Sequence, residues 1–379
     1  MISWEVKSTQ EALDAGRDPA YITDADGEVW PLVIIEVEPD LSTPDQGTIV
    51  WEWKLWDHVV QDFDSTKPNF GVIADEPAKV NLNDGRDGRA DWIHANSIDY
   101  NETLDQILIS TPFYNEMWII NHALTTEEAA TDAGDLMYRW GNPAAYGRGT
   151  VDDQRSFFQH DARWIPEGYP GAGNITFYNN GQNRPDGLYS TADELVTPLL
   201  NDGTYDLAEG EAYGPAESIV IYQADVPTDM YSSGLSGVER IANGNTLICQ
   251  GRGSGTDPAN GKFIEVNDAG EVVWFYINPG TPAGPMIQGD APINQKAFRC
   301  SHYPSDYAGF AGKDMTPGNT VELDRCGGDV DFDGDSDVND ILAIIEAFGS
   351  QGSSNADVNC SGAVTVDDIL QAIGNFGGC

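Results

Sequence analysis

The segment Gly270-Glu-Val-Val-Trp-Phe-Tyr276 combines β-branched and aromatic residues in the manner of a β-strand. The same pattern occurs three times earlier in the chain, as Gly47-Thr-Ile-Val-Trp-Glu-Trp53, Gly134-Asp-Leu-Met-Tyr-Arg-Trp140 and Glu217-Ser-Ile-Val-Ile-Tyr222. A pattern that returns at intervals of tens of residues is typical of a repeat architecture. We therefore expect one structural unit, built around such a strand, to occur about four times.

A second kind of segment precedes three of these strands, at residues 98–110, 165–180 and 241–251. Each copy has the pattern of a strand, a turn rich in Gly and Asn, and a further strand. No long amphipathic helix intervenes. Strand groups repeated with aromatic punctuation indicate an all-β protein of the β-propeller type, because a β-sandwich would not explain the recurrence.

The composition restricts the partners of the chain. Its 379 residues carry 62 acidic and 19 basic side chains, for a formal net charge of −43. Repulsion between like charges argues against binding to nucleic acid or to an anionic membrane. No apolar run approaches the roughly 20 residues that span a bilayer, and residues 1–30 lack the basic and apolar regions of an export signal. The sequence as written predicts a soluble chain without a membrane span.

Two of the five histidines, His94 and His160, stand where strand-like segments begin. The first strand of each propeller blade lines the central channel, so the entrances to these strands converge on one mouth of that channel. Ser236 occupies the corresponding place in the next repeat, and His58 lies in a loop that can reach the same mouth. Matched positions favour a shared pocket over the alternative, which is a set of structural or solvent-facing histidines. No HxH or HxxxH spacing indicates a histidine metal site.

The residues also carry a family resemblance. Five segments together resemble the bacterial arylsulfotransferase (ASST) family, namely WEWKLWDHVVQDFD (51–64), DWIHANSIDYNETLDQILIS (91–110), GDLMYRWGNPAAYGRG (134–149), QHDARWIPEGYPGAGNITFYNNG (159–181) and NGNTLICQGR (243–252). The resemblance covers roughly residues 2–317. It implies a six-bladed propeller that moves a sulfuryl group from a phenolic sulfate ester to a phenol without a nucleotide sulfate donor or another cofactor.

The resemblance also implies roles for four residues. His160 matches the histidine that is transiently sulfated, and His94 and Asn96 match residues that hold the sulfuryl oxygens. His58 matches a further channel histidine. The chemistry suits these residue types, since a neutral imidazole can attack sulfur and donors can stabilise the charge that develops on oxygen.

Two features depart from the family pattern. The family has an arginine in the strand after the HxN motif, where this chain has Pro112, which offers neither charge nor donor. Arg148, Arg155 and Arg163 are candidates to replace it. Only four outer strands are recognisable where six blades need six, and the chain begins inside the family pattern, so we expect an N-terminus that is either truncated or misassigned.

The last part of the sequence is a separate module with two acidic loops. Asp329-Val-Asp-Phe-Asp-Gly-Asp-Ser-Asp-Val-Asn-Asp340 has carboxylates at positions 1, 3, 5, 9 and 12 and glycine at position 6, as a twelve-residue calcium loop does. The candidate ligands are Asp329, Asp331, Asp333, Asp335, Asp337 and Asp340. A repeat spans 357–368, with the candidate ligands Asp357, Asn359, Ser361, Thr365 and Asp368. Apolar helices are expected at 341–348 and 369–376.

This duplicated loop and helix resembles type I dockerins. The resemblance implies bound Ca²⁺, an extracytoplasmic (secreted or periplasmic) location, and a cohesin-like or cell-surface partner. We place the domain boundary between residues 325 and 326, which gives a propeller at 1–325 and a dockerin-like domain at 326–379. Cys326 and Cys379 bracket that domain; a disulfide between them and ordinary small buried cysteines are both compatible with the sequence.

Three functions remain in view. The first is an exported aryl-sulfate sulfotransferase. The second is a catalytically silent propeller that serves as a binding or scaffold module of an extracellular assembly, which Pro112 and the missing blades favour. The third is a glycan-acting enzyme, although the acidic residues are too numerous for one catalytic carboxylate pair to be recognised.

Overall fold

A computed structural model of the chain describes all residues except 44, 86–87, 254–260, 282–283, 287–294, 318–320, 323–326, 332, 334, 352–353, 360 and 378–379. The chain divides into two compact units. The β-sheet unit contains Met1–Asn278 and Ile293–Lys313, and the C-terminal unit contains Pro279–Pro292 and Asp314–Cys379. The predicted boundary at 325/326 and the cysteines Cys326 and Cys379 lie outside the described residues.

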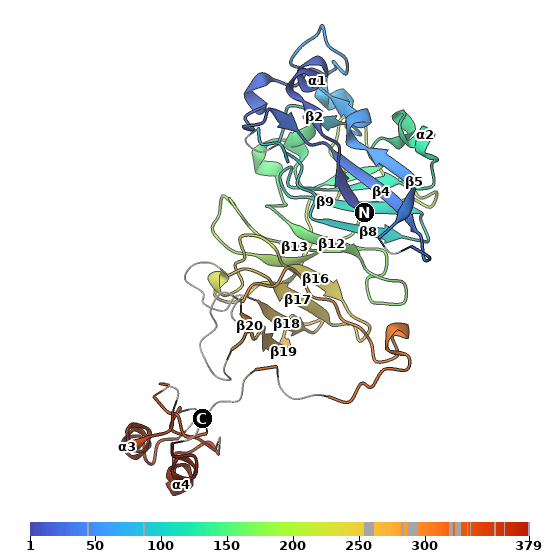
Figure 1. The fold of residues 1–379 in the computed structure, drawn as a ribbon. Coiled ribbons are helices and arrows are strands. Elements are labelled where there is room, and N and C mark those ends of the chain that lie inside the picture. The colour runs from blue at the N-terminus through green and yellow to red at the C-terminus, as the bar shows by residue number, and fades with distance from the viewer. Residues whose placement is uncertain are drawn as a thin grey trace. The chain divides into compact units, whose positions relative to one another are not determined.

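The described part of the β-sheet unit holds four larger antiparallel sheets, which follow one another in chain order (Figure 1). Sheet 1 contains β1 (Ile2–Trp4), β4 (Leu32–Pro39) and β5 (Gly47–Lys54). Sheet 2 contains β8 (Ser97–Asn101), β9 (Gln106–Thr111), β10 (Glu116–Asn121) and β11 (Tyr138–Trp140). Sheet 3 contains β12 (His160–Trp164), β13 (Ile175–Asn179), β14 (Thr191–Leu195) and β15 (Ile219–Tyr222). Sheet 4 contains β16 (Gly237–Arg240), β17 (Thr246–Gln250), β18 (Lys262–Val266) and β19 (Val272–Ile277).

Smaller elements complete the chain. Short strand pairs are formed by β2 (Lys7–Ser8) with β3 (Glu28–Val29), β6 (Val59–Val60) with β7 (Val80–Asn81), and β20 (Gly280–Thr281) with β21 (Gly284–Pro285). The α-helices are α1 (Thr9–Asp14), α2 (Thr126–Ala129), α3 (Val338–Glu346) and α4 (Val366–Gly374). None of the described helices is long and apolar enough to cross a membrane.

The four predicted outer strands are confirmed as the last strands of the four sheets, β5, β11, β15 and β19. In three of them the strand begins later than the sequence pattern, and β19 does so by two residues, at Val272. Residues Asp132–Gly134 form a helical turn, so β11 begins only at Tyr138, and β15 begins at Ile219. The all-β expectation therefore holds for this unit, with three four-stranded sheets that resemble propeller blades among the described residues.

The sheets pack face to face because successive side chains of a strand point to opposite faces. In β9, Ile107 and Ile109 join the core shared with sheet 1, whereas Leu108 joins the core shared with sheet 3. Strand β10 divides in the same way, with Trp118 on the first side and Met117 on the second. A third core joins sheets 3 and 4. Buried on both faces, sheet 2 is a fixed support for the loops at its ends.

The C-terminal unit has its own small core, formed by Val330, Ile344, Ala356, Val364 and Ala372. Both predicted helices are present, but they begin three residues earlier than the apolar pattern indicates, at Val338 and Val366. The reason is capping. Asp337 and Thr365 are the N-cap residues, and each forms a reciprocal capping box with the aspartate three residues on.

Candidate functional site

The first strands of sheets 2 and 3, β8 and β12, lie side by side. The backbone N–H of Ala162 donates to Ser97 Oγ at 3.0 Å, and that of Trp164 donates to Asp99 Oδ2 at 2.8 Å. His160 is the first residue of β12, whereas His94 lies three residues before β8 begins. The two histidines therefore lie at the same end of the two sheets, but His160 is inside its strand and His94 is in the loop before its strand.

Residues at this end have unusual backbone conformations. His94, Asp161 and Ser236 have φ values of 53°, 58° and 89°, in the left-handed region that residues with a side chain rarely occupy. Each such residue costs of order 1–3 kcal/mol and persists only where the surrounding structure imposes it. Their recurrence at the entrances to β8, β12 and β16 marks this end as a candidate site.

His160 is held in one tautomer by Asn180. The Asn180 amide nitrogen donates to the carbonyls of Ser232 at 2.8 Å and Leu235 at 3.1 Å, so its Oδ1 is the atom that faces His160. That oxygen lies 2.8 Å from His160 Nδ1 and can only accept, so Nδ1 carries the proton. The other ring nitrogen, Nε2, is then unprotonated and has its lone pair available for attack.

The surroundings of His160 keep its ring neutral. Its side chain is almost fully buried. Burial lowers its pKa from the usual 6.5 to about 4; the hydrogen bonds to Asn180 and Phe158 oppose this change, while His94 and Arg299 reinforce it. At neutral pH the imidazole is therefore uncharged, as a nucleophile must be.

A row of aromatic rings joins His160 to His94. His94 stacks on Phe113 with ring centroids 4.8 Å apart, Phe113 stacks on Phe158 at 5.7 Å, and Phe158 lies 5.6 Å from His160. His94 is exposed at the open end of the row, where Asp91 Oδ2 holds its Nδ1 at 2.5 Å. The row gives the site an apolar surface on which an aromatic ring can pack.

Asn96 lies at the same site. Its amide nitrogen donates to the carbonyl of Gln159, directly before His160, at 2.8 Å. Its Oδ1 is buried and makes no hydrogen bond to the described residues. A buried acceptor without a partner costs about 1–3 kcal/mol, and a bound donor group would remove that cost.

His58 is placed differently. It is fully buried and stacked on Trp53, with Nδ1 at 2.8 Å from Asp135 Oδ1 and Nε2 at 2.8 Å from the Ala129 carbonyl. Both ring nitrogens are occupied, so neither is available to a substrate. The structure thus brings His94, Asn96 and His160 together, and within the described residues no hydrogen bond or ring contact joins His58 to them.

Pro112 lies in the turn between β9 and β10, where it directly precedes Phe113 of the aromatic row. Of the arginines proposed to replace the missing one, Arg163 pairs with Asp161 at 3.0 Å and Glu239 at 3.2 Å. Arg148 donates to the carbonyls of Ala74 and Glu211, each at 2.8 Å. Arg155 pairs with Glu217 and donates to the carbonyls of Asp152 and Gln154.

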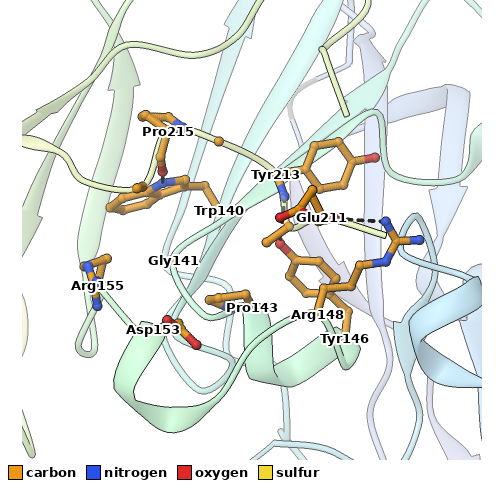
Figure 2. A pocket seen from close by; sticks show the side chains of 13 residues that line it. Trp140, Gly141, Pro143, Tyr146, Arg148, Asp153, Arg155, Glu211, Tyr213 and Pro215 are labelled. Carbon is orange, nitrogen blue, oxygen red and sulfur yellow. Dashed lines mark hydrogen bonds between the residues drawn. The ribbon is translucent and has the colours of Figure 1, made fainter. Parts of the chain in front are cut away.

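Arg148 and Arg155 line a separate pocket of about 410 Å³, shown in Figure 2. Its wall includes Trp140, whose indole N–H donates to the Pro215 carbonyl at 2.7 Å, and Tyr213. None of the five histidines lines it. The pocket has aromatic, cationic and acidic walls, and none of the candidate site residues His58, His94, Asn96 and His160 lines it.

Sequence reasoning missed two residues of the histidine site, Asn180 and Arg299. Arg299 donates from Nη1 to Asp161 Oδ1 at 2.8 Å and from Nη2 to the Asn96 carbonyl at 2.7 Å. It lies 138 residues from Asp161 in a segment without strand character, so no local sequence pattern predicts its place in the site. Asn180 follows β13, and only its place at a strand end could have drawn attention to it.

The first acidic loop gathers its carboxylates into two groups. Oxygens of Asp329, Asp331 and Asp333 lie within 4.8 Å of one another, and so do those of Asp335, Asp337 and Asp340. Repulsion from Asp333 and other aspartates raises the pKa of Asp335, and a bound cation would relieve that repulsion. Oxygen ligands in this number suit Ca²⁺.

Asp340 closes this loop from inside. Burial opposes its ionisation, but hydrogen bonds from the backbone N–H groups of Asp337, Val330 and Asp331 outweigh that effect and lower its pKa. In the second loop, Asp368 accepts from Asn359 and Thr365 in the same way, and Asp357 accepts from the N–H groups of Ser361 and Gly362. The second loop therefore has the same backbone design with fewer charges.

Comparison with known proteins identifies a family for the β-sheet unit. No curated protein matches the chain. A selenomethionine-substituted virginiamycin B lyase from Staphylococcus aureus is similar at 11% identity and a TM-score of 0.25, over 75% of this chain and 77% of that one. The sequence model of the arylsulfotransferase (ASST) family matches residues 33–279, a range that includes His94, Asn96 and His160. The chain therefore belongs to the arylsulfotransferase (ASST) family.

Proposed function

We propose that this protein is an aryl-sulfate sulfotransferase that carries the sulfuryl group on His160. The observation that supports this most strongly is the fixed neutral tautomer of His160, with Nδ1–H held by Asn180 and Nε2 unprotonated. Family membership supports the same reaction class. The donor would be a phenolic sulfate ester and the acceptor a phenol.

The reaction would run in two steps that balance without a cofactor. In the first, the Nε2 lone pair attacks sulfur, the bond from sulfur to the phenolic oxygen breaks, and a phenolate leaves. In the second, the oxygen of the acceptor phenol attacks the same sulfur and loses its proton to water, and the electron pair of the S–N bond returns to Nε2. The phenolate released in the first step takes up a proton from water, so the proton count balances. Dividing one difficult transfer into two easier ones is the advantage of covalent catalysis.

The neighbouring groups have separate parts in this proposal. His94 and the second amide N–H of Asn96 would hold the sulfuryl oxygens, on which negative charge increases in the transition state. Donors preorganised in a site shielded from water are worth a few kcal/mol each, and the exposed His94 is expected to contribute less than that. Phe113 and Phe158 would pack against the aromatic ring of donor or acceptor. His58 has a supporting role, because Asp135 and the Ala129 carbonyl occupy its nitrogens.

The direct test uses the full chain with 4-nitrophenyl sulfate, with and without phenol. We expect nitrophenolate release that depends on phenol, and without phenol a peptide containing His160 that gains the mass of one SO₃ group. His302→Ala is the matched control, because His302 is an exposed histidine. Transfer without any modification of the His160 peptide would contradict the sulfohistidine step.

A binding or scaffold module is the second candidate function. Pro112, in place of the family arginine, is the observation that favours it. A silent protein would bind phenolic sulfates or phenols, or a protein partner, without releasing nitrophenolate. Equilibrium binding of 4-nitrophenyl sulfate in the absence of turnover would support this alternative.

We further propose that the C-terminal unit binds Ca²⁺ and docks onto a cohesin-like or cell-surface partner. Eight apolar side chains that are 51–59% exposed occur as two sets, each residue of one set 28 positions from its counterpart in the other: Val338, Leu342, Ile345 and Phe348; Val366, Leu370, Ile373 and Phe376. Exposed apolar patches of this kind commonly mark interaction sites. Leu342→Asp with Leu370→Asp should abolish capture by an immobilised cohesin while Ca²⁺ binding continues.

Location and ring size complete the proposal. A dockerin-like tail fits a secreted or periplasmic protein, and detection of the protein only in the cytoplasm of its native cell would contradict this. The six-bladed ring is the architecture that the family resemblance implies; three four-stranded sheets and one three-stranded sheet occur in the described residues of the β-sheet unit.

A further inference from the structure

The segment after sheet 4 returns to the entrance of the histidine site and is fastened there. The N–H of Ala297 donates to the Gly251 carbonyl at 3.0 Å, and the Phe298 carbonyl accepts from the N–H of Ser236 at 2.9 Å. Further along, the N–H of His302 donates to Glu239 Oε2 at 3.1 Å. Residues 297–302 are thus held along β16, from its start, and beside the end of β17.

Side chains fasten the same segment. Arg163 donates to Ser301 Oγ at 3.2 Å and to the Cys300 carbonyl at 3.5 Å. The thiol of Cys300 also contacts the buried thiol of Cys249 on β17, and this hydrogen bond raises the pKa of Cys249. Arg299 therefore projects from a segment that is fixed on both sides of it.

Arg299 bridges the two parts of the chain that carry the proposed sulfuryl-binding residues. Its Nη1 contacts Asp161, the neighbour of His160, and its Nη2 contacts the backbone of Asn96. A guanidinium has five N–H donors, and these contacts use two of them. Asp161 divides its single negative charge between Arg299 at 2.8 Å and Arg163 at 3.0 Å, while Arg163 is also compensated by Glu239.

We propose that Arg299 is a catalytic residue that donates hydrogen bonds to the sulfuryl oxygens on His160, and so supplies the cation that Pro112 cannot. This inference rests on the proposed function. During both steps the guanidinium stays protonated and forms no covalent bond; it stabilises the negative charge on the oxygens while the bonds to sulfur change. Arg299 comes from a different part of the chain than the family arginine at the position of Pro112, but in this proposal it acts on the same sulfuryl group.

The test compares the donor half-reaction of wild type, Arg299→Gln and Arg299→Lys. Loss of one such donor from an oxyanion site typically costs about 100-fold or more in rate. We expect that loss in kcat/KM for 4-nitrophenyl sulfate with Arg299→Gln, and a smaller loss with Arg299→Lys, which keeps the charge but not the planar fork. Added guanidinium ion should restore part of the rate to Arg299→Ala.

Arg240→Gln is the matched control, since it removes an arginine paired with Glu194 at 2.7 Å, away from these contacts. Its kcat/KM should stay within about threefold of wild type, as for a substitution without shared partners. Thermal unfolding of all variants identifies any that fail to fold. If Arg299→Gln fails to fold, Arg299→Lys takes its place in the comparison.

A second readout does not depend on turnover. NMR titration of His160 should show a higher pKa in Arg299→Gln than in wild type, because a positive charge next to the imidazole has been removed. Inorganic sulfate should shift the His160 ring signals of wild type, and this response should weaken by about tenfold or more in affinity in the variant.

The outcomes separate the two proposals. Active wild type with an equally active Arg299→Gln would overturn the role of Arg299 and leave the proposed function standing. Inactive wild type would overturn the proposed function; the sulfate response would then decide whether Arg299 binds an anion beside His160. An unchanged His160 titration together with unchanged sulfate affinity would refute the inference in either case.

Discussion

The histidine site and the first acidic loop are assembled in opposite ways. The histidine site joins Asn96, His160 and Arg299, which belong to segments far apart in the chain, whereas the loop holds its carboxylates between Asp329 and Asp340. Packed sheets position the first group, so its geometry exists before any ligand arrives. Backbone N–H groups position Asp340 in the loop, but neighbouring aspartates repel Asp335, and a cation bound there would relieve that repulsion. A site built from distant segments requires the whole unit to fold first, and the packed sheets then keep it rigid. A site within one loop requires only a short sequence pattern, and its geometry would depend on its ligand.

The largest expected effect is at His160. Replacing it with alanine removes the nucleophile, and we expect sulfuryl transfer to fall on the order of 10⁴-fold or more. The measurement is phenol-dependent nitrophenolate release from 4-nitrophenyl sulfate, with His302→Ala as the control. Activity within tenfold of wild type would show that His160 is not the nucleophile. The histidine site would then no longer stand as a reactive centre to compare with the acidic loop.

The pH dependence should distinguish His160 from an exposed histidine. Its folded pKa of about 4 lies below the unfolded value of 6.5, so the unfolded chain binds the extra proton first as the pH falls. Stability should be intact above pH 6.5 and decline by about 3 kcal/mol as the pH falls towards 4, with no further loss from this group below that. Urea unfolding of wild type and His160→Gln between pH 8 and pH 4 isolates this contribution.

The same shift should appear in the kinetics. The kcat/KM for the donor should stay level from pH 8 to about pH 5, because the imidazole remains neutral over that range. A decline centred near pH 6.5 would show that the site is more open to water than its burial indicates.

Removal of Ca²⁺ should affect the acidic loop and leave the histidine site unchanged. At a free Ca²⁺ concentration 100 times Kd, binding stabilises the folded unit by about 2.7 kcal/mol. Asp329→Ala should lose this stabilisation, while Asp367→Ala, which removes an aspartate outside the candidate ligands, should keep it. Hydrogen exchange of α3 with Ca²⁺ and with a chelator measures the difference in the full chain. Equal protection in both conditions would argue against a calcium loop.

Asn180 tests whether the tautomer of His160 is essential. Asn180→Ala removes the closer of the two acceptors of Nδ1 and leaves the Phe158 carbonyl at 3.1 Å. We expect the donor half-reaction to slow by about tenfold, because the ring is held less firmly in the reactive form. Asn180→Asp places a negative charge against the ring and should raise the pKa of His160. Stopped-flow sulfation and NMR titration provide the two readouts, and an unchanged sulfation rate in Asn180→Ala would contradict the role of the tautomer.

The smallest effect is expected in the second loop. Among its candidate ligands only Asp357 and Asp368 carry charge, so its affinity should be lower than that of the first loop. At ten times its Kd, Ca²⁺ would contribute about 1.4 kcal/mol, which Asp357→Ala should remove. Calorimetric titration should show one strong and one weak Ca²⁺ site. Two sites of equal affinity would contradict the expectation that affinity follows the number of charged ligands.

The parts of the fold that follow local patterns were predictable. The four outer strands, the two acidic loops and the existence of both C-terminal helices follow from composition and spacing. The starts of α3 and α4 differed by three residues because polar caps, not apolar residues, begin them. The burial of His58 against Trp53 and the return of Arg299 depend on packing between distant segments, which no local pattern contains.

The hydrogen bond from Arg299 to the Asn96 carbonyl also has a consequence in time. It spans 203 residues, and a ribosome that adds about 5–20 residues per second needs on the order of ten seconds or more to produce that length. During that interval sheets 2 and 3 can form with His160 in place, while the segment that fastens Asn96 and Asp161 does not yet exist. Any nascent or cleaved chain that ends before residue 299 would therefore present the histidine without its arginine, so the last residues to join the β-sheet unit would decide when its chemistry begins.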